Sequence, residues 1–339
     1  MRWPIMAGRI RRSLGAIGLV IGALVLAGSA SAGSLESRSL PAGPYPGSRE
    51  RIYRVFVPDD LPADGGAPVV MLLHGCLQDE RDMIEDTRFT ELAERDGFIV
   101  VFPFVTSYPF LPLRARNCWG FFVEGQRQEG RGEAADLRRI FGAVEEEFRA
   151  DPARRYVAGL SSGGAMAVVM AVAYSEDIAA AGAVAGVPYG EDACAVAHAC
   201  FTGVRHRPVA ALREAMRAEQ QAEEDQRLVP LMVIHSTNDG TVPIKNALNL
   251  RDAWIAHHAP DATLAGTGDC TTDGVPCEHS RFVDRAGRTV VETVFYDGPR
   301  FGRTHFWVGD HEGRFADPDG PSASELLWDF FRQHRLAPD

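Results

Sequence analysis

The sequence has 339 residues, of which 45% are hydrophobic and 24% charged, proportions that are ordinary for a globular protein and sufficient for a full hydrophobic core. Its formal net charge of −11 at pH 7 argues against nucleic acid or an anionic membrane as a partner. There is no low-complexity tract and no repeat of fixed period, and the length suits one large domain or two small ones.

The first 32 residues have the pattern of a signal peptide. Four arginines lie within residues 1–12, an apolar run covers 14–27, and Ala-Ser-Ala at 30–32 fits a cleavage site. The apolar run is shorter than the roughly 20 residues that span a bilayer. We therefore expect a mature chain that begins near Gly33, carries a formal charge of −15 after loss of four arginines and no acid, and is periplasmic or secreted. An uncleaved membrane anchor is the alternative.

Strand and helix patterns alternate along the rest of the chain, after a Gly-, Pro- and Ser-rich stretch at 33–49 that predicts a flexible lead-in. The predicted strands are 51–58 (an edge strand), 68–74, 98–104, 156–160, 180–187, 228–234 and 289–295. The predicted helices are 88–95, 132–150, 163–174, 204–224 and 322–334. Such alternation predicts an α/β fold with a mostly parallel central sheet and helices on both faces. We expect one domain over residues 50–336.

The sequence GLSSG at 159–163 fits the G-x-S-x-G pattern of a nucleophilic serine. The pattern alone is weak, but here it follows a predicted strand and opens a predicted helix, as the chemistry requires. Glycines on both sides permit the sharp turn that lifts the serine hydroxyl out of the sheet. We predict Ser161 as the nucleophile. Ser162 is the alternative nucleophile, but it is expected to supply a backbone N–H to the oxyanion.

A second donor to the oxyanion is expected from His74-Gly75-Cys76, which directly follows the run VVMLL. The backbone N–H of Cys76, or alternatively that of Leu77, would act together with that of Ser162. His74 is expected to make a structural hydrogen bond, with the alternative that it is itself a catalytic base.

The acid and the base of a triad are expected after the serine, in that order. Asp239 lies in NDGTVP at 238–243, on a tight turn just past a predicted buried strand, where its carboxylate can reach an imidazole. A simple turn or helix-cap aspartate is the alternative. His305, between the last predicted strand and the last predicted helix, is the expected base, and His311 and His279 are its rivals.

Six cysteines in an exported chain predict disulfides rather than a metal site, because they show no ligand spacing. Sequence alone does not decide among all the possible pairings. Four of the cysteines form two pairs close in sequence that can each close a small loop, and the other two then pair with each other: Cys194–Cys200, Cys270–Cys277 and Cys76–Cys118.

Several of these segments together resemble the poly(3-hydroxybutyrate) depolymerase-like esterases, a family that includes feruloyl and acetylxylan esterases. The segments that carry the resemblance, in order, are LHGC at 73–76, NCW at 117–119, GRGEAADLRRI at 130–140, DPARRYVAGLSSGGAMA at 151–167, AGAVAGVPYG at 181–190, NDGTVP at 238–243 and HFW at 305–307. The resemblance implies an α/β-hydrolase fold, export and a Ser161–Asp239–His305 triad. It also implies that Trp119 lies near the site, either as a pocket wall or as a core residue.

These observations predict an exported serine esterase that hydrolyses carboxylic esters through an acyl-enzyme, without metal or cofactor. A feruloyl or acetylxylan esterase is the nearest alternative, and a serine peptidase or a non-catalytic binding protein are more distant ones. THFWVGD at 304–310 departs from the small, Gly-rich surroundings of the histidine in the family, and GDCTTDGVPC at 268–277 is also unusual. Both affect the expected pocket more than the triad. The end of the chain just after the last predicted helix favours soluble or oligomeric esters over a solid polymer.

Overall fold

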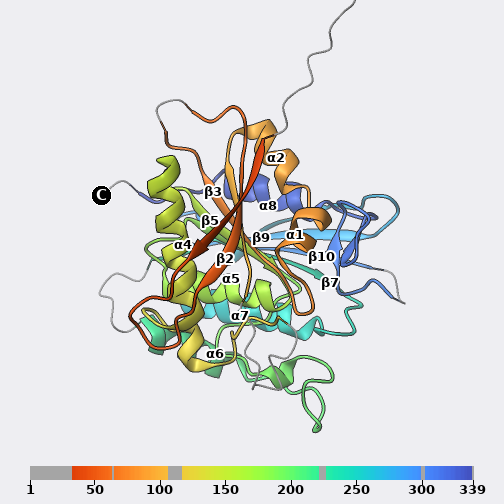
Figure 1. Ribbon diagram of the computed structural model, residues 1–339. Coiled ribbons are helices and arrows are strands. Elements are labelled where there is room, and N and C mark those ends of the chain that lie inside the picture. Colours follow the sequence, from red (N-terminus) through yellow and green to blue (C-terminus); the bar gives the residue numbers. More distant parts are fainter. Residues whose placement is uncertain (1–32, 63–64, 106–116, 221–226, 299–301, 338–339) are drawn as a thin grey trace, which may run out of the picture. The chain divides into compact units, whose positions relative to one another are not determined.

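The computed structural model divides the chain into two compact units, Met1–Ser31 and Ala32–Asp339. It describes residues 33–62, 65–105, 117–220, 227–298 and 302–337, so the expected signal peptide lies outside the described residues. All elements below belong to the second unit (Figure 1). No helix within the described ranges has the length and apolar character needed to cross a membrane.

The described residues form one ten-stranded sheet in the order β1-β2-β4-β3-β5-β6-β7-β10-β9-β8. Its strands are β1 (Ser34–Leu40), β2 (Arg51–Val57), β3 (Val69–Leu73), β4 (Ile99–Pro103), β5 (Arg155–Leu160), β6 (Ala180–Val184), β7 (Leu231–Ser236), β8 (Thr263–Asp269), β9 (Cys277–Val283) and β10 (Thr289–Tyr296). The six strands from β4 to β10 in this order pair in parallel, and the pairs at both ends are antiparallel. The predicted mostly parallel sheet is therefore confirmed.

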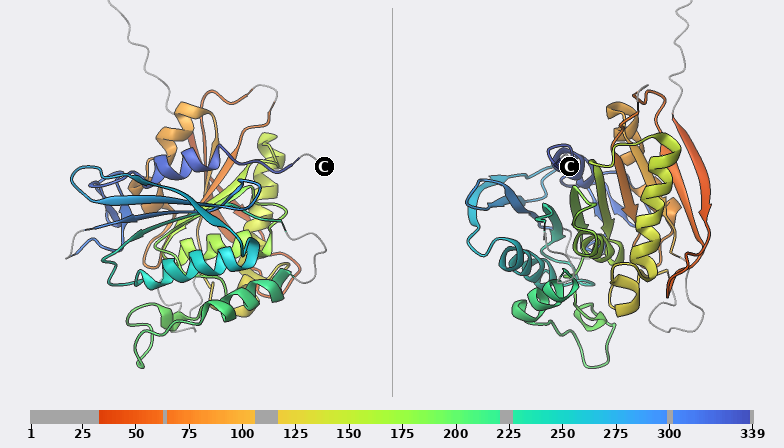
Figure 2. Two further views of the ribbon diagram at one scale, coloured as in Figure 1. Left: turned by 180° about the vertical axis from the view of Figure 1, so that it is seen from behind. Right: turned by 90° about the vertical axis from the view of Figure 1, so that its left-hand side faces the viewer.

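Helices cover both faces of this sheet (Figure 2). They are α1 (Glu80–Asp86), α2 (Phe89–Asp96), α3 (Glu124–Arg127), α4 (Gly132–Phe148), α5 (Ser162–Ala173), α6 (Val209–Gln220), α7 (Lys245–His258) and α8 (Ala323–Phe331), with a 3₁₀ turn at Ala193–Ala195. A short parallel pair, β11 (Trp307–Val308) and β12 (Ala316–Asp317), lies apart from the main sheet.

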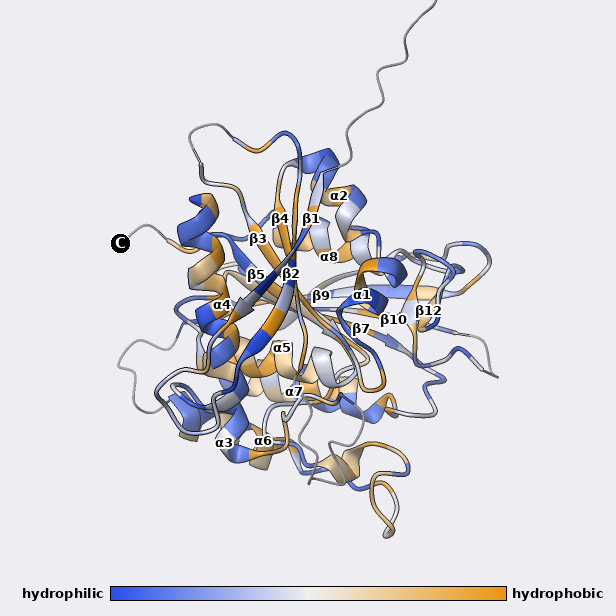
Figure 3. Cartoon of the chain, viewed as in Figure 1, coloured by the Kyte–Doolittle hydropathy of each residue, from blue (hydrophilic) through white to orange (hydrophobic). Residues whose placement is uncertain are grey.

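Each face of the sheet has its own apolar core, because successive side chains of a strand point to opposite faces. In β3, Val69, Met71 and Leu73 join one core with α4, α5 and α7, while Val70 and Leu72 join the other with α2 and α8. All five residues are fully buried, as expected for central parallel strands. In Figure 3, hydrophobic residues follow the buried helix α5, whereas hydrophilic residues follow the largely exposed strand β1.

The ends of the sheet differ from the sequence-based expectation. Residues 34–40, expected within a flexible lead-in, form β1, which pairs along its whole length with β2. The strand predicted at 51–58 is therefore internal, and its prediction as an edge strand is wrong. Strand β8 and helix α7 were also not predicted. Strands β1 and β8 are largely exposed, so they lack the regular apolar pattern on which strand prediction depends.

All three predicted disulfides are present: Cys76–Cys118, Cys194–Cys200 and Cys270–Cys277. The first joins segments 42 residues apart, and the other two close local loops of 6 and 7 residues.

Candidate active site

Ser161 stands at the turn between β5 and α5, where the chain leaves the centre of the sheet and enters a buried helix. Its backbone has φ 57° and ψ −117°, and its N–H donates to the carbonyl of Val184 at 2.8 Å. A positive φ is strained for a residue with a side chain, and such strain is held in place by the surrounding packing. The turn leaves Ser161 partly exposed while Ser162 is buried.

Contacts with the end of β3 explain why glycines flank this serine. A Cβ atom at Gly159 would lie 2.5 Å from both the Leu73 carbonyl oxygen and the Gly163 carbonyl carbon. A Cβ at Gly163 would overlap the Leu73 carbonyl and approach the His74 oxygen to 2.6 Å. The two glycines therefore let the turn pack directly against the chain that leaves β3, which is the steric requirement behind the sequence pattern.

The predicted oxyanion loop lies against the serine. A Cβ at Gly75 would be 3.3 Å from the Ser161 Cβ, which places this loop next to the hydroxyl. Gln78 holds the loop, since its Oε1 accepts the Gly75 N–H at 2.6 Å. Cys76 is fixed by its disulfide to Cys118. Ser162 opens α5, and the first N–H groups of a helix have no partner within the helix and favour negative charge.

His74 and Trp119 support this loop from the core. His74 is fully buried, its Nδ1–H donates to the Gly75 carbonyl at 2.9 Å, and its Nε2 accepts the Val105 N–H at 3.1 Å. Burial lowers the pKa of His74 to about 4, so the ring is neutral and both nitrogens are engaged, as a structural role requires.

Trp119 is also fully buried, and its indole N–H donates to the His74 carbonyl at 2.9 Å. This position favours the core alternative over a role as a pocket wall.

Asp239 and His305 are brought together from positions 66 residues apart. Asp239 follows β7, and its Oδ1 accepts the backbone N–H groups of Thr241 and Val242, both at 2.8 Å. Its Oδ2 accepts the Nδ1–H of His305 at 2.7 Å. This bond fixes the tautomer in which Nε2 of His305 carries no proton, the form that a general base needs.

Within the described residues, no hydrogen bond joins the Ser161 hydroxyl to His305. Catalytic hydrogen bonds are often long before substrate binds, so this geometry does not disqualify the pair. The rival histidines have other partners: His311 pairs with Glu91 at 3.1 Å, and His279 pairs with Glu292 at 2.7 Å.

Two further side chains that the sequence analysis did not identify hold the acid and the base. His235, at the end of β7, is fully buried, donates from Nε2 to the Val242 carbonyl at 2.7 Å, and lies 3.6 Å from Asp239 Oδ2. Burial lowers the pKa of His235, so it acts as a neutral donor beneath the acid-bearing turn. In the sequence, the only sign of this role is that His235 directly follows a predicted buried strand, four residues before Asp239.

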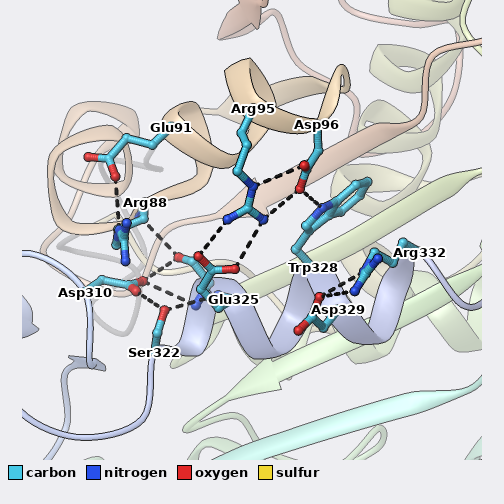
Figure 4. Close-up of polar contacts among 11 residues, drawn as sticks. Arg88, Glu91, Arg95, Asp96, Asp310, Ser322, Glu325, Trp328, Asp329 and Arg332 are labelled. Atoms are coloured by element: carbon cyan, nitrogen blue, oxygen red, sulfur yellow. Dashed lines mark hydrogen bonds and ion pairs between the residues drawn. The ribbon is translucent and has the colours of Figure 1, made fainter.

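Asp310 anchors the chain just after His305. It accepts the Trp307 indole N–H and the Ser322 hydroxyl, both at 2.5 Å, and also the hydroxyl of Ser324. Figure 4 shows Asp310 with Ser322 at the start of α8, beside the ion pairs that join α2 to α8. The base-bearing segment is therefore tied to the N-terminus of α8.

No group of three or more His, Cys, Asp or Glu side chains within the described ranges is arranged to hold a metal ion.

Comparison with known proteins agrees with this architecture. The family described as Esterase PHB depolymerase matches residues 52–273, a range that includes Ser161 and Asp239 and ends before His305. Poly(3-hydroxyalkanoate) depolymerase C of Paucimonas lemoignei is 28% identical over 293 residues, covering 85% of this chain and 66% of the relative. Feruloyl esterase B of Neurospora crassa is 33% identical over 154 residues, covering 45% of this chain and 46% of the relative.

Among solved structures, an acetyl xylan esterase from Aspergillus awamori superposes with a TM-score of 0.64 at 18% identity, covering 88% of this chain and 99% of that one. That likeness concerns the fold. The chain spans about half to two thirds of the length of the first curated relatives. The fold is that of an α/β-hydrolase. Because the family match covers well over half of the sequence, the chain belongs to the Esterase PHB depolymerase family.

Proposed function

We propose that this protein is an exported serine esterase that hydrolyses carboxylic esters in the manner of a poly(3-hydroxybutyrate) depolymerase. The observation that carries the proposal is the 2.7 Å hydrogen bond between His305 and Asp239, at the edge of the sheet where the strained Ser161 turn also lies. The ends of parallel strands β5 and β7 share this edge, with β6 between them. An esterase family match over the serine and the acid supports the same reaction class.

In the proposed mechanism, Nε2 of His305 takes the proton of the Ser161 hydroxyl as the oxygen attacks the ester carbonyl carbon. Asp239 stabilises the imidazolium through its bond to Nδ1. The imidazolium then gives its proton to the leaving alcohol, and an acyl-enzyme forms on Ser161. Water, activated by the same histidine, attacks the acyl carbon and releases the acid, which restores the serine.

The negative oxygen of each tetrahedral intermediate is assigned to the backbone N–H groups of Cys76 and Ser162. Each such donor contributes on the order of 10²–10³ in rate when it is held in place before the reaction. The supports described above, from the disulfide, Gln78 and His74, provide that rigidity.

The proposed substrates are soluble or oligomeric esters, with hydroxyalkanoate oligomers first. Feruloyl or acetylated cell-wall polysaccharide is the second candidate, favoured by the 33% identity to a feruloyl esterase. The proposed organisation is a signal peptide at 1–32 and a catalytic domain at 50–336, preceded by the segment 33–49 that contains β1. The three disulfides support an oxidising destination such as the periplasm or the cell exterior.

The test is to treat the purified mature protein with a fluorophosphonate probe and to map the labelled residue by mass spectrometry, beside Ser161→Ala and Ser162→Ala. We expect the label on Ser161, and a loss of both labelling and p-nitrophenyl ester hydrolysis in Ser161→Ala by a factor of at least about 10³. Unchanged labelling in Ser161→Ala, or a label on Ser162, would contradict the assignment. Rates on hydroxybutyrate oligomers, methyl ferulate and acetylated xylan then separate the two substrate candidates.

A further inference from the structure

A buried carboxylate, Asp86, contacts both the predicted oxyanion loop and the chain that follows His305. It is the last residue of α1, it is 1% exposed, and it belongs to neither the triad nor the oxyanion loop. Its Oδ2 accepts two hydrogen bonds, from Gln78 Nε2 at 3.4 Å and from the Phe315 backbone N–H at 3.2 Å. Gln78 belongs to the predicted oxyanion loop, and Phe315 to the chain that follows His305.

The Gln78 contact leads to the oxyanion loop. The Gln78 amide gives its oxygen to the Gly75 N–H at 2.6 Å and its NH₂ group to Asp86. Gln78 is itself 1% exposed, so water does not replace either bond readily. The carboxylate of Asp86 therefore fixes which way the Gln78 amide points, and with it the position of the residue that precedes Cys76.

The Phe315 contact leads to the base. The carbonyl of Phe315 accepts the Trp307 N–H at 2.8 Å, and Trp307 lies two residues after His305. The same segment pairs as β12 with β11, and the Asp86 Oδ1 lies against Gly313, where a side chain would collide with it. Asp86 thus holds the strand that supports the base-bearing segment.

We propose that Asp86 is a positioning residue that couples the oxyanion loop to the His305 segment through its two hydrogen-bonded contacts. The inference rests on the proposed function. Asp86 touches no reacting atom, and its effect passes through Gln78 on one side and through Phe315 and Trp307 on the other. Both hydrogen bonds end on Oδ2, so a single charged acceptor atom joins the two segments.

Burial raises the pKa of Asp86 to about 6, and its acidic neighbours on α1, Asp82 and Glu85, act in the same direction. Arg314, from the opposite segment, is 3.7 Å from Asp82. The carboxylate is accordingly ionised at pH 7 and takes up a proton near pH 6, and the loss of charge then weakens both hydrogen bonds to Oδ2.

The test compares Asp86→Asn with Glu85→Gln, which removes a neighbouring exposed carboxylate from the same helix. Asparagine keeps the size of the side chain but removes its charge, so a neutral amide oxygen in the Oδ2 position accepts both hydrogen bonds more weakly. We expect Asp86→Asn to lower kcat by on the order of tenfold to a hundredfold with little change in KM, and to slow fluorophosphonate labelling by a similar factor. Glu85→Gln is expected to match the parent.

Two further readouts separate positioning from loss of stability. The kcat profile of the parent should show an inflection near pH 6 that is absent from Asp86→Asn, because the carboxylate that titrates there is gone. The double variant Gln78→Ala/Asp86→Asn should also lose less kcat than the product of the two single losses, because both substitutions act through the same loop.

An Asp86→Asn enzyme with kcat within twofold of the parent would overturn the inference. So would a loss of kcat that is fully explained by the fraction of unfolded enzyme. A double variant Gln78→Ala/Asp86→Asn whose loss of kcat equals the product of the two single losses would overturn it as well. An inactive Ser161→Ala enzyme beside a fully active Asp86→Asn enzyme would overturn this inference alone. An active Ser161→Ala enzyme would overturn the proposed function first.

Discussion

At the scale of single residues, Asp239 concentrates three hydrogen bonds on one carboxylate, two from backbone N–H groups and one from His305. The backbone pair orients the carboxylate, and the third bond sets the tautomer of the base. These tasks fall on different oxygens, Oδ1 for the backbone and Oδ2 for the imidazole, so a substitution can separate them.

Asp239→Asn is expected to keep the fold and lose the chemistry. The amide oxygen can still accept the two N–H groups, but the NH₂ group then faces His305, which must turn to its other tautomer and presents a proton toward Ser161. We expect kcat to fall by about 10³–10⁴ with little change in the free energy of unfolding. Steady-state kinetics and urea denaturation check this, with Glu312→Gln as the control, because Glu312 is an exposed carboxylate that pairs with Arg303. An Asp239→Asn enzyme that retains a tenth of the parent kcat would contradict a role for Asp239 in the triad.

The residues that the sequence identified are those whose chemistry depends on local spacing. Ser161 could be predicted as the nucleophile because its turn requires glycines at fixed offsets, and Asp239 as the acid because it follows a buried strand. Supporting residues such as His235, Asp86 and Asp310 were missed, because each acts on a partner that the fold, not the sequence neighbourhood, brings within reach. Their contacts with those partners are the signal, and these contacts appear only in three dimensions.

At the scale of elements, the central strands were predictable and the outer ones were not. Strands β3 and β4 are continuous apolar runs because helices cover both faces, so composition alone reveals them. Strand β8 is exposed at every residue, and β1 at most of them. Those strands are held by backbone pairing with a neighbour, a contribution that leaves almost no trace in hydropathy.

The disulfide Cys76–Cys118 restrains the predicted oxyanion loop most directly. It joins the oxyanion loop to the segment of Asn117 and Trp119, whose side chains donate to the carbonyls of Gln78 and His74 at 3.1 and 2.9 Å. The Cys76 N–H is thereby held between two fixed segments. The disulfide Cys194–Cys200 closes a short loop elsewhere and provides a matched comparison.

We expect the double variant Cys76→Ser/Cys118→Ser to lower kcat at least tenfold at a temperature where it stays folded, because a loosened oxyanion donor loses part of its 10²–10³ contribution. Its free energy of unfolding should also fall by about 2–4 kcal/mol. Cys194→Ser/Cys200→Ser should change stability while kcat per folded molecule is retained. Equal effects of the two pairs on kcat would contradict a specific role for the first.

At the scale of the whole molecule, we expect one buried and three half-buried histidines to make stability depend on pH. Burial lowers the pKa of His74, His257 and His334 to about 4 and that of His258 to about 3. Since the unfolded chain binds protons near pH 6.5 and the folded chain does not, the stability from these groups is complete above 6.5 and is lost as pH falls toward 4. The pKa of Asp86 is raised to about 6, so below that pH this group favours the folded state as pH falls. It is one group against the four histidines.

The free energy of unfolding should therefore be nearly level above pH 7 and decline from about pH 6.5 downward, independently of catalysis. His334 allows one contribution to be isolated, because its ring packs against Phe330, with ring centroids 4.6 Å apart, far along the chain from the triad. His334→Gln should reduce the slope of stability against pH between 5 and 6 by nearly one proton, whereas the exposed His198→Gln serves as the control for loss of an imidazole. Urea denaturation across pH 4.5–8 measures both slopes. Two outcomes would contradict this prediction: a parent protein as stable at pH 5 as at pH 7, or an unchanged slope of stability against pH in His334→Gln. Either result would mean that these rings are hydrated in solution. Acid inactivation would then have to originate at the triad and Asp86 alone.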